Sequence, residues 1–113
     1  MPISYENKGG DMKTKRSKAC DISQKVKKIV WERDNGCCVI CGNGYNVMPN
    51  AHFIPRSKGG LGVEENIFTA CTRLTHNDCH YKFDEYGIGR DKVREYLISI
   101  YPYWDENNLK YKK

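Results

Sequence analysis

The sequence lacks any hydrophobic run long enough to cross a membrane. No apolar stretch reaches the roughly 18 residues that identify a transmembrane helix, and no signal-peptide core follows Met1. We therefore expect a cytoplasmic protein with no membrane partner. Thiols stay reduced in that compartment, so the 6 cysteines of the chain favour metal ligation over disulfide bonds.

The first 20 residues also have few apolar side chains. They contain the pair Gly9-Gly10 and a basic run that includes Lys15 and Arg16, which predicts a basic, flexible tail over residues 1–20. Residues 21–113 are predicted to form a single domain with a core over about 38–86, since no repeat or linker divides them. The net charge of +5 favours a polyanionic partner.

Four of the cysteines have the spacing of zinc ligands. Cys38-x-x-Cys41-Gly42 has the form of a zinc knuckle, in which two thiolates reach one ion and the glycine lets backbone amides face the sulfur atoms. Cys71 and Cys79 follow at a distance that can complete a tetrahedral site. Cys37 offers a second register, Cys37-x3-Cys41, but we prefer Cys38 and interpret Cys37 as a packed or free thiol. Zinc would fold a segment that has little core of its own.

Hydrophobic periodicity predicts an α+β chain. Trp31 is expected to extend the apolar face of a first helix, and Trp104 to seal the core beside a last one. The glycine-rich stretch over residues 55–62 predicts an irregular loop that joins two strands into a hairpin. The predicted elements are a helix capped by Asp21 or Ser23 and ended by Asp34-Asn35-Gly36, strands over 46–54 and 67–70, and helices over about 78–86 and 90–100.

Between and beside the cysteines lie residue types that can activate water and hold a divalent cation, namely His52, Asn66 and His80. His52 ends a predicted strand and precedes the loop that carries Arg56 and Lys58, where a phosphate could bind. A histidine merely packed in the hairpin and an asparagine that holds a turn are the structural alternatives for His52 and Asn66.

Taken together and in this order, these pieces resemble the zinc-containing HNH endonucleases, particularly the small free-standing ones of phages and mobile elements. The match covers roughly residues 22–86. The matching pieces are Trp31-Glu32-Arg33-Asp34-Asn35-Gly36, Cys38-x-x-Cys41-Gly42, His52-Phe53-Ile54-Pro55-Arg56-Ser57-Lys58-Gly59-Gly60, Glu65-Asn66-Ile67 and Cys79-His80.

The resemblance implies a ββα-metal core with a structural zinc, flanked by N- and C-terminal helices, in a metal-dependent DNA endonuclease. It implies His52 as the general base, Asn66 as the residue that orients it, and His80 as a ligand of the catalytic cation, Mg²⁺ or another ion such as Mn²⁺ or Ni²⁺. Single-metal hydrolysis would leave 5′-phosphate and 3′-hydroxyl ends. The implied zinc ligands are Cys38, Cys41, Cys71 and Cys79, and the implied setting is the cytoplasm of a bacterium or a phage-infected host cell.

The chain departs from the family at the position before the base and at the closing cysteines. Many members carry an aspartate or histidine metal ligand where this chain has Ala51. Cys71 and Cys79 replace the usual Cys-x-x-Cys, so His76 competes with Cys71 as the third zinc ligand. We favour Cys71, because it follows Asn66 by five residues as the first closing cysteine of the family does.

Asp84 stands four residues after His80, and on a helix this spacing puts both side chains on one face. Asp84 could therefore replace the ligand lost at Ala51, although a solvated helical aspartate is an equal alternative. Glu64 and Glu65 are weaker candidates for the same role.

The cations of the loop and the tail suit a nucleic-acid partner. Arg56 and Lys58 are expected to contact phosphates, and Lys15 and Arg16 to add affinity without sequence preference. A zinc-stapled DNA-binding module that has lost catalysis is the alternative function, and Ala51 is the feature that favours it. An RNA-binding or protein-interaction zinc domain would fit the charge but leaves His52, Asn66 and His80 unexplained.

Overall fold

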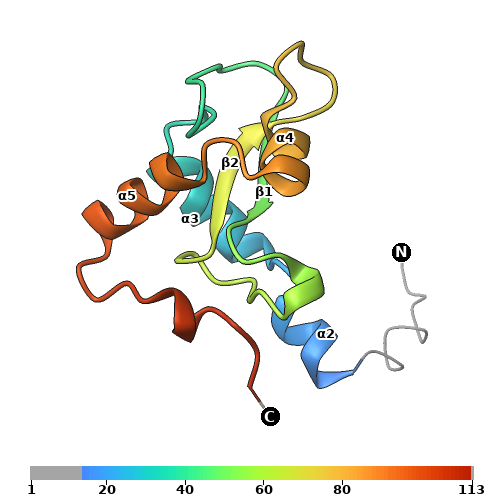
Figure 1. Ribbon diagram of the computed structural model, residues 1–113, viewed down its shortest axis with the longest axis vertical. Helices are drawn as coiled ribbons and strands as arrows, with labels where there is room; N and C mark the ends of the chain where they lie inside the picture. Colours follow the sequence, from blue (N-terminus) through green and yellow to red (C-terminus); the bar gives the residue numbers. More distant parts are fainter. Residues whose placement is uncertain (1–13, 113) are drawn as a thin grey trace.

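A two-stranded antiparallel hairpin lies at the centre of the molecule, with helices packed around it (Figure 1). The computed structural model describes residues 14–112. Among these residues, no helix is long and apolar enough to span a membrane. The elements are α2 (Lys15–Cys20), α3 (Gln24–Arg33), β1 (Val47–His52), the 3-10 turn η2 (Arg56–Lys58), β2 (Ile67–Cys71), α4 (Cys79–Tyr86), α5 (Arg90–Ile100) and the 3-10 turn η3 (Glu106–Asn108).

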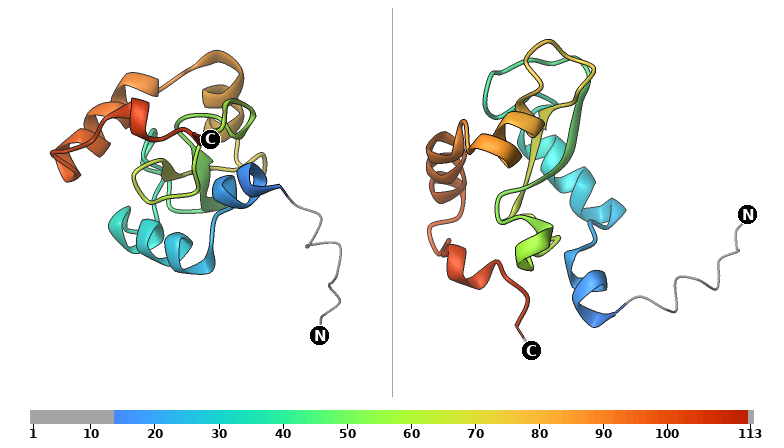
Figure 2. Two further views of the ribbon diagram at one scale, coloured as in Figure 1. Left: turned by 90° about the horizontal axis from the view of Figure 1, so that it is seen from below. Right: turned by 45° about the vertical axis from the view of Figure 1, so that its right-hand side comes forward.

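The predicted hairpin is confirmed. Val47 pairs with Cys71 at one end and His52 with Ile67 at the other, with an irregularity in register between Met48 and Ala51. All residues of β2 are buried. In the right-hand view of Figure 2 the hairpin lies between α3 and α4, which explains why β2 has no solvent-facing residue.

Helix α3 forms where the sequence predicts it. Ser23 is the cap, and its hydroxyl accepts a hydrogen bond from the Val26 amide at 3.1 Å. Val30 is fully buried against the hairpin. Trp31 is 42% exposed, so the prediction that it extends the buried face is wrong. Instead, its indole packs over Gly36, where an added Cβ would lie 2.9 Å from the ring.

Helix α3 is fixed to the hairpin through a buried ion pair. Arg33 and Asp34 form a bidentate contact, with nitrogen–oxygen distances of 2.7 and 3.1 Å. Arg33 also donates to the carbonyl of Ile67 in β2, and Asp34 accepts from the Thr69 amide of the same strand. Because both charges are buried and hydrogen-bonded, they fix the distance and angle between α3 and β2.

The core is closed by aromatic rings from four parts of the chain. Phe53 follows β1, Phe68 lies in β2 and Phe83 in α4; the Phe68 and Phe83 ring centroids are 4.9 Å apart. Trp104 contacts Phe53 edge-on with centroids 5.3 Å apart, as expected of a residue that seals the core. Helix α5 has its predicted bounds and buries Val93 and Leu97.

The prediction of little fixed structure before residue 20 is wrong for the described part of that segment. Lys15–Cys20 form α2, which Thr14 caps by accepting from the Ser17 amide at 3.0 Å. Cys20 is 1% exposed. Because α2 is short and basic, its stability comes from contacts with distant loop residues, among them the hydrogen bonds of Arg16 to Ser57 and of Arg56 to Ser17. Residues 1–13 of the predicted tail lie outside the described part of the chain.

The loop between the strands is held from two sides. It contains η2, although the sequence predicted only irregular structure there. On one side the Gly62 amide donates to the Ala19 carbonyl at 3.0 Å, and on the other the Leu61 amide donates to the Leu109 carbonyl at 2.8 Å. In Figure 1 the loop accordingly lies between α2 and the C-terminal segment.

Candidate functional site

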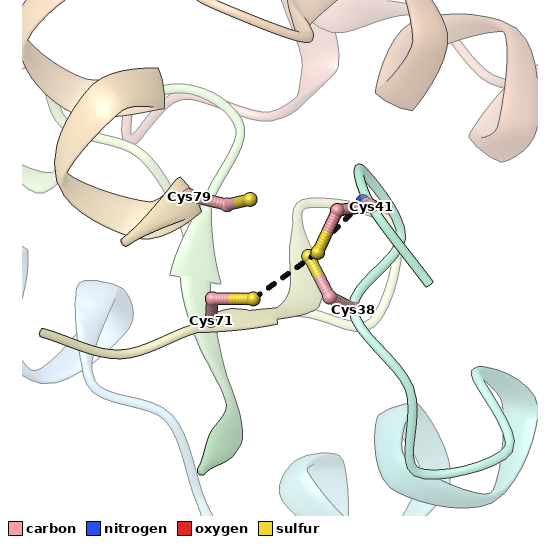
Figure 3. Close-up of side chains that lie close together, drawn as sticks. All are labelled: Cys38, Cys41, Cys71 and Cys79. Carbon is pink, nitrogen blue, oxygen red and sulfur yellow. Dashed lines mark hydrogen bonds between the residues drawn. The ribbon is translucent and has the colours of Figure 1, made fainter. Parts of the chain in front are cut away.

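Four cysteine side chains converge at one end of the hairpin (Figure 3). Cys38 and Cys41 come from the loop after α3, Cys71 is the last residue of β2, and Cys79 is the first residue of α4. Their Sγ atoms all lie within 4.8 Å of one another. The predicted cluster therefore forms, and it joins the loop after α3 to β2 and to the start of α4.

The Cys38–Cys41 turn is shaped by local hydrogen bonds. The Gly42 amide donates to the Cys38 carbonyl at 2.8 Å, and Gly42 has φ +81°, which a residue with a side chain rarely adopts. The Cys41 amide points at the Cys38 Sγ atom, 3.4 Å away. The Val39 amide donates to the Thr69 carbonyl of β2 at 2.9 Å, which holds the turn against the hairpin.

The arrangement of the thiols fits a tetrahedral zinc ion. Zinc–sulfur bonds of about 2.3 Å place neighbouring sulfur atoms about 3.8 Å apart, within the spread seen here. The Asn77 amide group donates to Cys41 Sγ at 3.4 Å, the type of contact that stabilises a thiolate ligand. The cluster contains Cys71 and leaves out His76 and Cys37. The Cys37 thiol instead donates to the Asn35 carbonyl at 3.3 Å.

The four thiols differ in their acidity. Burial raises the pKa of Cys71, and the neighbouring Cys41 and Cys38 raise it further. Burial and the proximity of Cys38 also raise the pKa of Cys79. Burial acts in the same direction on Cys41, but a hydrogen bond from the Asn43 amide and contacts with Cys71 and Asn77 outweigh it and lower the pKa of Cys41 to about 7. Four thiolates this close together repel one another, so the cysteine cluster is stable in its deprotonated form only when a bound cation compensates the negative charge.

A second group of predicted site residues surrounds a cavity of about 450 Å³. The cavity lies between the end of β1, the loop after it and one face of α4. Its lining residues are His52, Pro55, Arg56, Ser57, Lys58, His80, Asp84 and Glu85.

His52 is partly buried in the wall of this cavity, and its Nε2 atom lies 3.0 Å from the carbonyl oxygen of Cys20. A carbonyl oxygen can only accept, so Nε2 carries the proton in the neutral ring and Nδ1 carries the lone pair. Burial lowers the pKa of His52, and the positive charge of Arg56 adds to this, although the hydrogen bond to Cys20 acts in the opposite direction. The ring is therefore neutral at neutral pH.

His80 and Asp84 form a pair across one turn of α4. The His80 Nε2 atom lies 3.3 Å from Asp84 Oδ2, and both side chains are partly exposed, at 28% and 43%. An imidazole and a carboxylate at this spacing offer two ligand atoms to a cation at the cavity wall.

Asn66 is fully buried and binds the backbone that follows His52. Its Oδ1 accepts from the Ile54 amide at 2.8 Å, and its Nδ2 donates to the Leu61 carbonyl at 2.8 Å and to the Ile54 carbonyl at 3.3 Å. The Asn66 carbonyl accepts from the Phe53 amide at 2.7 Å. Asn66 therefore holds Ile54 and Leu61, on either side of the segment that carries Arg56 and Lys58, in place. Any effect of Asn66 on the orientation of His52 acts through the backbone of Phe53 and Ile54.

The predicted phosphate contacts lie in different surroundings. The Arg56 guanidinium lines the cavity but donates to Asp21 Oδ1 at 2.6 Å and to the Ser17 carbonyl at 3.1 Å. Arg16 donates to the Ser57 carbonyl at 3.0 Å. Lys58 is exposed at the cavity, and Lys15 is exposed on α2. Both arginines thus join α2 to the loop, and their phosphate contacts stay a prediction.

The alternative ligand positions are occupied by other contacts. Glu64 accepts from the Tyr101 hydroxyl at 2.7 Å and Glu65 from the Tyr103 hydroxyl at 2.9 Å, and neither lines the cavity. Ala51 is fully buried in the hydrophobic core and pairs with Phe68. In the described structure, Asp84 is thus the candidate carboxylate that lies beside His80.

Two further hollows adjoin this cavity and share lining residues with it. A hollow of about 410 Å³ next to α2 shares Arg56 and Ser57 with it. On the other side, a hollow of about 300 Å³ shares His80 and Asp84 and also contains Arg73 and Tyr81. Cations therefore lie on both sides of the His52 cavity.

Sequence reasoning missed the groups that surround His52. Cys20 contributes its carbonyl, and Ser17 and Asp21 hold Arg56; the sequence separations are 32, 39 and 35 residues. Thr14-Lys15-Arg16-Ser17 contains a capping pair, the signal that could have indicated α2. A backbone carbonyl has no signature in the sequence.

Comparison of the chain with protein-family models, curated proteins and solved structures finds no match.

Proposed function

We propose that this chain is a metal-dependent DNA endonuclease of the HNH type, with a ββα-metal core formed by β1, β2 and α4. The observation that carries the proposal is the cavity that brings together His52, the His80–Asp84 pair and the cations Arg56 and Lys58. Phosphodiester hydrolysis requires a base, a cation to balance charge and groups that bind the phosphate. All of these residue types line the same cavity.

His52 is the general base in this proposal. Its Nε2–H is engaged with the Cys20 carbonyl, which leaves the Nδ1 lone pair to accept the proton of the attacking water. The water oxygen then bonds to phosphorus, and the bond to the 3′ oxygen breaks. That oxygen takes a proton from solvent, which gives a 5′-phosphate and a 3′-hydroxyl end.

His80 and Asp84 are the proposed ligands of the catalytic cation. A divalent cation held there would supply positive charge to the phosphate oxygens as negative charge builds up on them. Asp84 gives the pair the carboxylate that a hard ion such as Mg²⁺ requires. In this way α4 supplies the ligand that Ala51, buried in the core, does not provide.

The hollows that adjoin the cavity offer further contacts for a polynucleotide strand. Arg16 lines the hollow beside α2, Lys58 lines the cavity itself, and Arg73 lines the hollow that shares His80 and Asp84. Cations in adjoining hollows can contact successive phosphates and give affinity without reading the bases. The four cysteines would hold a structural zinc that fixes the start of α4, and thereby His80, against the hairpin.

The test is incubation of supercoiled plasmid with the zinc-loaded protein in Mg²⁺, Mn²⁺ or Ni²⁺, beside the variant His52→Ala. We expect nicked or linear DNA from the wild type and a rate lower by about 10²- to 10⁴-fold in the variant at equal zinc content. Salt-dependent DNA binding without cleavage in any of these cations would instead identify the alternative, a zinc-stapled DNA-binding module. Ala51 is the observation that favours that alternative, because the position before His52 has no ligand atom.

A further inference from the structure

Helix α2 meets the proposed base directly, although it lies outside the hairpin and α4. Its last residue, Cys20, presents its carbonyl oxygen to His52 Nε2 at 3.0 Å. Cys20 is 1% exposed, so water has little access to this contact. A hydrogen bond shielded in this way selects the Nε2–H form of the neutral ring.

The position of the Cys20 carbonyl is set by side-chain contacts between α2 and the loop. Arg56 donates to Asp21 Oδ1 at 2.6 Å, and to the Ser17 carbonyl and hydroxyl at 3.1 Å each. In the opposite direction, Arg16 donates to the Ser57 carbonyl at 3.0 Å. Helix α2 and the loop are thus linked in both directions, because each contributes an arginine that donates hydrogen bonds to the other. Two such contacts fix their relative position more firmly than one ion pair would.

Gly62 provides the closest approach between the two segments. Its amide donates to the Ala19 carbonyl at 3.0 Å. A Cβ atom at Gly62 would clash with the carbonyl group of Asp21 and lie 3.0 Å from the Cys20 carbonyl oxygen. Only glycine lets the end of α2 come this close to the loop.

We propose that residues 14–21 are a positioning element of the catalytic site, which holds the Cys20 carbonyl on His52 and so fixes the ring with its Nδ1 lone pair available as the base. Ser17, Asp21, Arg56 and Gly62 act through this contact and are positioning residues. The consequence for catalysis rests on the proposed endonuclease function. The tautomer of His52 follows from the contact with the Cys20 carbonyl and does not depend on that function.

The first test is nuclear magnetic resonance of the ring nitrogens in zinc-loaded protein labelled at histidine, at a pH where the rings are neutral. The chain has 3 histidines, and His52→Ala assigns the His52 signals. We expect the Nε2–H form for His52 in the wild type and a mixture of tautomers in Gly62→Ala. The matched control is Gly44→Ala, because the nearest atom to an added Cβ there is Cys37 Sγ at an ordinary 3.8 Å.

A second variant separates this role from phosphate binding and from misfolding. Arg56→Gln removes the contacts to Ser17 and Asp21 without inserting a Cβ. Positioning predicts mixed tautomers and a kcat lower by roughly 10- to 100-fold, whether or not the salt dependence of DNA binding also changes. A phosphate contact alone predicts the wild-type tautomer and a salt slope smaller by about one.

A single Nε2–H tautomer for His52 in both folded variants would overturn the proposal. If the variants show mixed tautomers but even the wild type cuts no DNA, the positioning element stands and the endonuclease function fails. Zinc content and thermal unfolding, measured for each variant, show whether Gly62→Ala is folded; if it is not, Arg56→Gln decides.

Discussion

The Nε2 atom of His80 lies 3.3 Å from Oδ2 of Asp84, one helical turn further along α4. A histidine beside an aspartate on an exposed helix is often a simple ion pair. Here both side chains also line the cavity that contains His52, which gives the pair access to any phosphate bound there. The relationship therefore leads to a prediction about the catalytic cation.

Asp84→Ala should lower DNA cleavage in Mg²⁺ by about 100-fold, because a single imidazole competes poorly with water for this ion. High Mn²⁺ should restore part of the activity, since Mn²⁺ accepts nitrogen ligands more readily than Mg²⁺. The measurement is the nicking rate as a function of cation concentration. Glu95→Ala, which removes an exposed carboxylate of α5, is the control and should cut as the wild type does. Equal rates for Asp84→Ala and the control would exclude Asp84 as a ligand.

The pH dependence of cleavage should report His52. The base must be neutral to accept a proton, so the rate should rise with pH and level off above the His52 pKa. Burial lowers that pKa, which places the midpoint of the rise below the ordinary histidine value of about 6.5. In His52→Ala the rate should fall by about 10²- to 10⁴-fold and the rise should disappear. A midpoint well above 6.5, or a variant that retains the rise, would assign the base elsewhere.

The four-cysteine cluster should hold one zinc ion on which the fold depends. Cys71→Ser and Cys79→Ser should lose the zinc and unfold the centre of the chain, because metal binding and folding are coupled at such sites. Cys37→Ser and His76→Ala, which change residues outside the cluster, should keep one zinc per chain. Elemental analysis and circular dichroism measure both properties. Zinc loss in His76→Ala with zinc retained in Cys71→Ser would reverse the choice of the third ligand.

The salt dependence of DNA binding should identify the cations that contact phosphate. Lys58→Ala should reduce the slope of log affinity against log salt by about one, equally for different DNA sequences. Lys28→Ala is the matched control, because Lys28 is exposed on α3, which covers the side of the hairpin away from α4. Identical slopes for both variants would remove Lys58 from the proposed interface.

The parts of the site that could be predicted from the sequence are those whose residues lie a few positions apart, so that their spacing alone indicates a turn or a helix face. The x-x spacing of Cys38 and Cys41 fits a tight turn, and the spacing of His80 and Asp84 fits a helix face, so both could be derived without the fold. Ligand chemistry allowed either Cys71 or His76 as the third ligand, and the choice of Cys71 rested on the resemblance to the HNH family. In the first two cases the sequence distance limits the geometry before tertiary packing does.

The surroundings of His52 could not be predicted in the same way. The contact between His52 and Cys20 joins a side chain to a backbone carbonyl 32 residues earlier, and any residue type could supply that carbonyl. Arg56 was expected to contact phosphate because it lies in a short, flexible, glycine-rich loop. Its partner Asp21 is the residue that follows α2, a helix that periodicity does not indicate because it has only 6 residues.

The last prediction concerns Asn66, whose amide bonds to both ends of the loop that carries Arg56 and Lys58. Asn66→Asp keeps an acceptor for the Ile54 amide but loses the donor to the Leu61 carbonyl, and a buried carboxylate then faces that carbonyl. This environment should raise the pKa of the new carboxyl above its unfolded value of about 3.9. Its protonated form can donate to the Leu61 carbonyl, so the variant should be closest to the wild type at low pH. The loss of stability should grow with pH and become constant above the raised pKa.

Thermal unfolding of zinc-loaded Asn66→Asp and wild type at pH 5.5 and pH 7.5 measures this difference, and subtracting the wild-type change removes the pH dependence of zinc binding. Asn66→Ala is the reference, because it leaves the Ile54 amide and the Leu61 carbonyl unpaired at every pH and should cost about 2–4 kcal/mol throughout. We expect the deficit of Asn66→Asp to be smaller at pH 5.5 than at pH 7.5, while that of Asn66→Ala stays constant. Parallel behaviour of the two variants would mean that the carboxyl is solvated, and that Asn66 does not hold the loop in the way its buried hydrogen bonds indicate.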